Sequence, residues 1–63
     1  MNDHETTLTL LAPKDKGAAD WWNGLGGERR RTVLVWLSLN PPPAGWLDNW
    51  TAIDWAYTEM VER

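Results

Sequence analysis

The sequence predicts a compact all-α domain of three helices with an extended N-terminal arm, and three observations support this fold class. The chain has 63 residues and no cysteine, so one small domain must be stabilised by packing, without disulfides or thiolate zinc sites. Six tryptophans supply large apolar side chains for a dense core. In the C-terminal half, apolar residues recur at steps of three and four, which is typical of amphipathic helices.

Residues 1–17 are expected to form a flexible or extended arm, and residues 18–63 a single tryptophan-rich helical domain. Threonine and leucine alternate loosely over residues 6–11, as in a half-buried strand, and a polar connection follows them. In the alternative fold, α+β, residues 6–11 pair with residues 32–38 in a small sheet. The arm stays the preferred interpretation.

The first helix is expected over residues 18–25, where two tryptophans and a leucine share one face, and a glycine pair ends it. The second is expected over residues 28–39. This segment is rich in strand formers, but its twelve residues between the glycine pair and the block Asn40-Pro41-Pro42-Pro43 fit an average helix better than a strand.

The third helix is expected over residues 46–62 as one helix. Its start is expected near Ala44 or at Asp48 as an N-cap, because Gly45 weakens the first turn. Its apolar residues follow one another at steps of four, three, four and three, from Trp46 to Met60. The centre of this stripe is expected to be buried in the core, and it consists of Trp50, Ile53 and Tyr57.

Few residues of the chain are suited to catalysis. His4 is the only histidine, cysteine is absent, and the single serine, Ser38, has no base nearby in the sequence. The glycines between the first two helices lack the lysine and hydroxyl of a phosphate-binding loop. We therefore expect no enzyme activity, no metal and no cofactor.

One candidate partner-binding site lies on the third helix. At 100° per residue, Trp55 is expected opposite Trp46, with Asp48, Glu59 and Glu62 as its neighbours. An exposed tryptophan among carboxylates is a candidate anchor for a partner with a basic surface. The alternative is a core role, in which the N-terminal arm or a second copy of the chain covers Trp55.

An alternative binding patch is the run Arg29, Arg30 and Arg31 at the start of the second helix. A short helix, a glycine turn and a second helix are superficially like a DNA-reading unit. The net charge of −3 opposes nucleic-acid binding, and Asp20, Glu28 and the acidic last helix are expected to neutralise the arginines internally. We expect no direct nucleic-acid partner.

Three short motifs stand out within residues 19–37: Trp21-Trp22-Asn23-Gly24-Leu25, Glu28-Arg29-Arg30 and Trp36-Leu37. In these motifs the chain resembles a loose group of small tryptophan-rich accessory proteins of plasmids and phages, which have no established activity. The resemblance implies a short helix, a tight turn and a second helix, and an origin in a mobile element.

Together these features predict a small interaction protein of a phage or plasmid that binds and inhibits a host or defence-system protein. Anti-CRISPR or anti-restriction action is one specific form. No apolar run reaches the roughly 20 residues of a membrane span, and no signal peptide is evident, so a cytoplasmic location without membrane contact is expected. The alternatives are a dimeric DNA-binding regulator and a structural or accessory subunit that self-assembles.

Overall fold

The computed structural model describes residues 12–63, and the predicted threonine–leucine segment of the arm lies outside the described residues. The described part is all-α, as predicted, with no strand among its residues. The α+β alternative is wrong because residues 32–38 lie inside a helix. In chain order the elements are α2 (Lys16–Gly24), α3 (Gly27–Leu39), the 3-10 turn η1 (Trp46–Asp48), α4 (Ala52–Tyr57) and the π-helical turn η2 (Thr58–Glu62).

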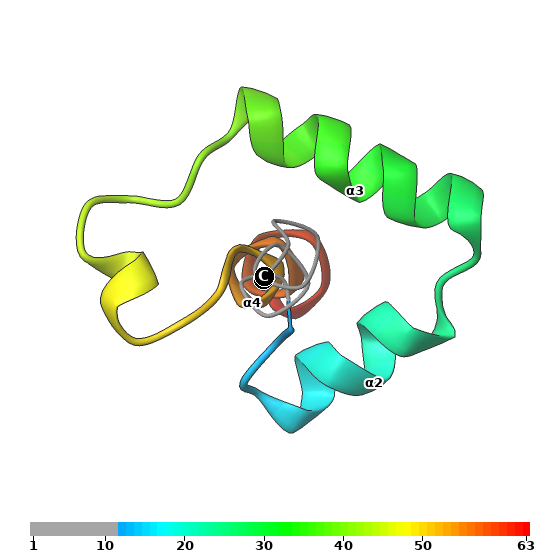
Figure 1. Cartoon of the computed structure of the whole chain (residues 1–63), viewed down its shortest axis with the longest axis horizontal. Helices are drawn as coiled ribbons and strands as arrows, with labels where there is room; N and C mark the ends of the chain where they lie inside the picture. Colours follow the sequence, from blue (N-terminus) through cyan, green and yellow to red (C-terminus); the bar gives the residue numbers. More distant parts are fainter. Residues whose placement is uncertain (1–11) are drawn as a thin grey trace, which may run out of the picture.

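The last helix is the centre of the fold. Figure 1 looks down α4 and η2, and α2, α3 and the loop that carries η1 are arranged around this axis. Ile53 and Ala56 of α4 are fully buried and pack with Val33 of α3. The larger side chains that surround this small cluster are partly buried: Trp21, Trp22, Leu25, Trp36 and Leu37.

Helix α2 begins at Lys16, two residues before the predicted start, because Asp15 caps it. The Asp15 carboxylate accepts a hydrogen bond of 3.1 Å from the main-chain N–H of Ala18. Gly17 in the first turn lets α4 come close. A Cβ at this position would stand 2.9 Å from the Tyr57 hydroxyl, which is closer than a side chain tolerates.

Helix α3 confirms the helical interpretation of residues 28–39 and ends at Leu39, directly before Asn40 and the prolines. Val33 faces the core. Apolar side chains also occupy the outer side of the helix, where Leu39 is 76% exposed and Val35 54% exposed. The apolar residues of this segment therefore cover more than the face that contacts α4.

The prediction of one continuous helix over residues 46–62 is wrong. The chain makes one 3-10 turn at Trp46–Asp48, leaves helical geometry at Asn49, and starts α4 at Ala52. Gly45, before the 3-10 turn, has a φ of 88°, a left-handed conformation that other residues rarely adopt. Thr51 then starts a new helix, because it forms a capping box with Asp54.

The interruption changes which residues of the predicted stripe are buried. Ile53 is fully buried, as predicted, and Tyr57 is half-buried. Trp50 lies before the new helix and is 43% exposed, so the prediction that it belongs to the core is wrong. A side chain on the far side of a helix break no longer follows the 100° rotation that places the others.

Candidate functional site

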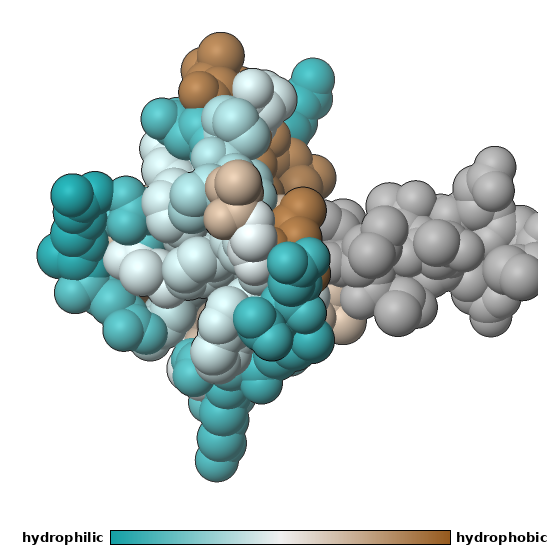
Figure 2. All heavy atoms as spheres, turned by 90° about the vertical axis from the view of Figure 1, so that its left-hand side faces the viewer, coloured by the Kyte–Doolittle hydropathy of each residue, from teal (hydrophilic) through white to brown (hydrophobic). Residues whose placement is uncertain are grey.

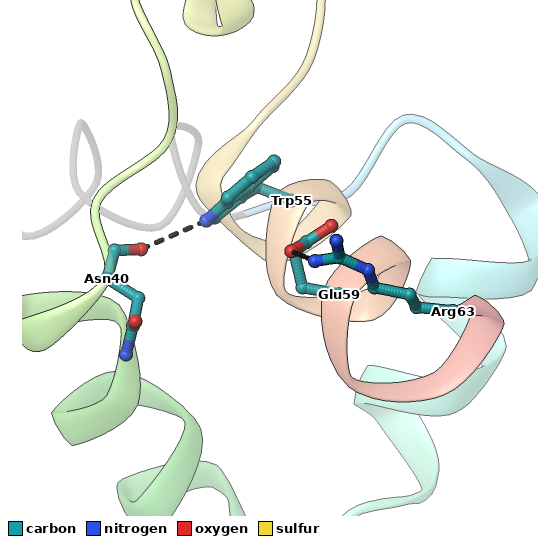
Figure 3. Close-up of polar contacts among 4 residues, drawn as sticks. All are labelled: Asn40, Trp55, Glu59 and Arg63. Carbon is teal, nitrogen blue, oxygen red and sulfur yellow. Dashed lines mark hydrogen bonds and ion pairs between the residues drawn. The ribbon is translucent and has the colours of Figure 1, made fainter.

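Trp55, the predicted anchor, lies in α4 and is half-buried. Its Nε1 donates a hydrogen bond of 2.9 Å to the main-chain oxygen of Asn40 (Figure 3). Its ring meets that of Trp46 edge-on, with centroids 5.2 Å apart. The expected placement of Trp55 opposite Trp46 is therefore wrong, because the chain turns between the two residues. Partner binding by Trp55 stays a prediction.

The three carboxylates predicted around Trp55 lie in different surroundings. Glu59 forms an ion pair with Arg63 one turn further on (Figure 3). Asp48 belongs to η1, ahead of the helix that carries Trp55. Glu62 lines a pocket together with Trp46 and Trp50.

Among the described residues, this pocket is the best candidate for a binding site, because it combines a concave shape with aromatic and acidic side chains. We call it the aromatic pocket. It has a volume of about 240 Å³ and opens between the start of α2, the η1 loop and the outer side of α4 and η2. Figure 2 faces the side of the molecule on which the η1 loop lies. Residues of intermediate hydropathy fill the centre, hydrophilic residues lie to the left and below, and hydrophobic residues lie at the top and along the right-hand edge. The lining residues are Asp15, Trp46, Trp50, Asp54, Tyr57, Thr58 and Glu62.

Contacts with the rest of the fold hold two of the three aromatic rings in place. The Trp46 Nε1 donates to the main-chain oxygen of Thr51 at 3.1 Å, and its ring packs on Trp55. The Tyr57 ring packs on Trp21, with centroids 5.5 Å apart. Trp50 lies beside Trp46, with centroids 6.4 Å apart and planes tilted by 38°, and forms the exposed wall.

Asp54, 2% exposed, is the buried charge of the pocket. Its carboxylate accepts hydrogen bonds from the main-chain N–H groups of Lys14, Asp15 and Thr51 and from the Thr51 hydroxyl, at 2.8–3.1 Å. Burial raises the pKa of Asp54, but these hydrogen bonds outweigh it and hold the pKa below its usual value. Asp54 therefore stays ionised at neutral pH and ties the start of α2 to the start of α4.

Sequence reasoning expected Trp46, Trp50 and Tyr57 in the core and did not place Asp15 in any site. One local signal would have located the helix start correctly. Thr51 and Asp54 have the spacing of a capping box just before an apolar run. No local signal brings Asp15 to this pocket, because it lies 39 residues from Asp54 in the chain.

The arginine run divides into one residue with interior contacts and two exposed ones. The Arg30 guanidinium donates to the main-chain oxygens of Trp22 and Asn23, at 3.1 and 3.4 Å. It also lies over the Trp22 ring, 5.2 Å from the centroid. Arg29 and Arg31 are exposed. Carbonyls at the end of α2 therefore engage Arg30, and the expected neutralisation by carboxylates is wrong, since the only ion pair among residues 12–63 is Glu59–Arg63.

A second hollow, of about 440 Å³, lies between α2, α3 and η2. Its lining is mainly apolar, with Arg29 as the one charged side chain. Its residues are Trp21, Leu25, Arg29, Thr32, Val33, Met60 and Val61. It therefore lacks the combination of aromatic rings and carboxylates that marks the aromatic pocket.

Within residues 12–63, no three side chains among His, Cys, Asp and Glu are grouped so that they could hold a metal ion. None of the helices in this range combines the length and apolar content needed to cross a membrane. Comparisons with models of protein families, with curated proteins and with solved structures find no match to this chain.

Proposed function

We propose that this chain is a non-enzymatic binding protein that inhibits a host or defence-system protein by covering a basic surface on it. The observation that carries the proposal is the aromatic pocket, where an exposed tryptophan stands beside three carboxylates. Tryptophan is enriched among residues that dominate binding energy at protein interfaces. Carboxylates around such an anchor favour a partner of opposite charge and speed the encounter.

The charge distribution supports a basic partner. Residues 32–63 contain four acids and one base, giving a charge of −3. The single base, Arg63, pairs with Glu59. Asp48, Asp54 and Glu62 therefore leave the side of the molecule around η1 with an excess of negative charge, which attracts lysines and arginines over a distance of about 8–10 Å at physiological salt.

The chemistry of the described side chains supports binding in preference to catalysis. The Ser38 hydroxyl, the only serine of the chain, donates to the main-chain oxygen of Val35 at 2.7 Å. That contact occupies its proton within α3. A nucleophile needs an adjacent base to be activated, so Ser38 is a helix residue in this proposal.

A phage or plasmid origin, with anti-CRISPR or anti-restriction action, is the specific form that we favour. It depends on the resemblance of residues 19–37 to small proteins of mobile elements. An acidic surface of this kind would compete with nucleic acid for a basic channel of the target. In this form the protein acts in the cytoplasm and needs no cofactor.

Affinity capture from a bacterial lysate, followed by an activity assay of the purified captured protein, tests the proposal. Wild-type chain should capture a protein whose activity falls when the chain is added. A Trp50→Ser chain, with a folded NMR spectrum, should lose capture, whereas the matched surface change Leu39→Ser on α3 should keep it. Capture that is equal for both variants, or a captured protein whose activity does not change, would contradict the proposal.

A further inference from the structure

The aromatic pocket has a composition that points to a ligand of defined charge. Its walls combine three aromatic rings with three carboxylates and the hydroxyls of Tyr57 and Thr58, and none of its lining residues within 12–63 is a lysine, arginine or histidine. The faces of aromatic rings are negative because of their quadrupole, so rings and carboxylates attract the same kind of group. That group is a cation.

The size of the pocket limits the ligand to a single side chain. Its volume of about 240 Å³ is below the range of roughly 300–1,000 Å³ that is typical of pockets for small-molecule ligands and cofactors. One arginine or lysine side chain fits such a volume together with its methylene stem. The open side, at Trp50 and Glu62, gives access from the surface.

The rings are arranged before any ligand binds. Trp46 is held by its hydrogen bond to Thr51 and by the ring of Trp55, and Tyr57 is held by Trp21. A ligand therefore needs to order little more than Trp50. Pre-organised walls lower the entropic cost of binding.

None of the three carboxylates of the pocket forms an ion pair within the described residues. The partners of the Asp54 carboxylate are main-chain N–H groups and a hydroxyl, which carry no net charge. Asp15 caps α2 through one carboxylate oxygen, which accepts from a neutral N–H group. Glu62 is exposed at the rim. An incoming cation would meet the exposed carboxylates of Asp15 and Glu62 and the field of the buried Asp54, and no basic side chain among residues 12–63 lines the pocket.

We propose that the aromatic pocket receives the guanidinium of an arginine side chain from the partner protein, stacked on Trp50 and paired with Asp15 or Glu62. Arginine is preferred to lysine because its planar guanidinium stacks on aromatic rings and donates two parallel hydrogen bonds to one carboxylate. This inference rests on the proposed function, since it names the chemistry by which that surface recognises its partner.

The described part of the chain contains one example of a guanidinium stacked on a tryptophan ring. Arg30 lies over the ring of Trp22 and donates to nearby oxygens, so a guanidinium and a tryptophan already pair within the fold. In the aromatic pocket the ring and oxygen atoms are present, and none of the lining residues within 12–63 supplies a cation. A second copy of the chain, which exposes Arg29 and Arg31, is the competing source.

An NMR titration of the full-length, ¹⁵N-labelled chain tests the inference without a partner protein. The probe is Nα-acetyl-arginine amide, and the matched control is the citrulline analogue, which has nearly the same shape and no charge. We expect the indole N–H signals of Trp46 and Trp50 to move saturably with the arginine probe, less with the lysine analogue, and not with citrulline. Added salt should weaken the effect.

Three variants assign the binding to the pocket. Trp50→Leu should weaken arginine binding by about threefold to thirtyfold, the range that a cation–π contact contributes between exposed and desolvated sites. Glu62→Gln should also weaken it, whereas Glu59→Gln, on the same turn but paired with Arg63, should not. Trp50 lies in the loop after η1, and Glu59 and Glu62 lie in η2. The NMR spectrum of each variant shows whether it is still folded.

Equal shifts with arginine and citrulline, or none with either, would overturn the inference. Binding of the lysine analogue more tightly than arginine would overturn the choice of guanidinium. Shifts that depend on chain concentration without a probe, and that disappear in an Arg29→Ala, Arg31→Ala chain, would assign the pocket to a second copy and also overturn it. If the arginine probe does not bind but partner capture still depends on Trp50, this inference is wrong and the proposed function is unaffected.

Discussion

The Nε1 of Trp55 donates a hydrogen bond of 2.9 Å to the main-chain oxygen of Asn40. Asn40 ends α3, and the prolines that follow it cannot continue the helix or donate a main-chain hydrogen bond. The carbonyls at the end of a helix need partners from elsewhere. Trp55 supplies one, and in doing so it joins the end of α3 to α4 across the loop that carries η1.

Replacing Trp55 therefore tests whether this contact stabilises the fold. We expect Trp55→Ala to lower the free energy of unfolding by about 2–4 kcal/mol, since it removes a packed ring and a hydrogen bond. Trp55→Phe keeps an aromatic ring without the donor and should lie between alanine and wild type. Urea unfolding measures both. A change within about ±0.5 kcal/mol for alanine would return Trp55 to the surface role that the sequence predicted.

The core prediction compares one buried and one exposed aliphatic residue. Ile53→Ala should destabilise the protein by about 2–4 kcal/mol, because Ile53 is fully buried at the centre of the fold. Leu39→Ala should change stability by less than about 0.5 kcal/mol, because Leu39 is 76% exposed. Thermal unfolding of the two variants decides the comparison. Equal destabilisation would mean that another surface covers the outer side of α3 in solution.

Asp54 makes stability depend on pH. Its pKa is lower in the folded than in the unfolded chain, so the folded state favours the ionised form. This contribution is complete above the unfolded pKa of about 4 and is lost as the pH falls through the folded pKa. Asp54→Asn should cost roughly 2–3 kcal/mol at neutral pH, where four donors lose an ionised acceptor, and less in acid.

Urea unfolding of wild type and Asp54→Asn, from neutral pH down through the acid range, measures this effect. The difference between the two proteins should shrink below about pH 4, because protonation then weakens the wild-type carboxylate in the same way. A constant difference over the whole range would show that the carboxylate is not ionised in the fold.

Arg30 is expected to be structural, unlike its neighbours. Arg30→Ala should cost about 1–3 kcal/mol, because it removes charged hydrogen bonds to the end of α2 and the contact with Trp22. Arg29→Ala and Arg31→Ala are the matched controls and should change stability by less than about 0.5 kcal/mol, since both residues are exposed. Chemical unfolding separates the three. Similar losses at all three positions would refute the distinction.

Duplex DNA should not bind the isolated protein appreciably at physiological salt. The net charge of −3 opposes the release of counterions that drives such binding, and Arg30 is engaged within the fold. A mobility-shift titration checks this. Micromolar, salt-sensitive binding that is lost in an Arg29→Ala, Arg31→Ala chain would favour the DNA-binding regulator over the inhibitor.

The helical class and the bounds of α3 were predictable because their signals are local. Three prolines after Asn40 end a helix whatever surrounds it, and the pair Gly26-Gly27 marks the boundary at which α3 begins. Burial of Ile53 followed from the helical period, which holds within α4. The error at residues 46–62 came from extending that period across Thr51, where a capping box starts a new helix.

The candidate site was less predictable because it joins distant segments. The sequence by itself determined a helical, tryptophan-rich chain with an acidic C-terminal half, since composition and local periodicity establish these properties. Only the tertiary structure decided that Trp50 faces solvent, that Trp55 contacts Trp46, and that Asp15 and Asp54 meet at one pocket. The physical reason is that a single break in a helix changes the direction of every side chain beyond it, and long-range hydrogen bonds then select which segments meet.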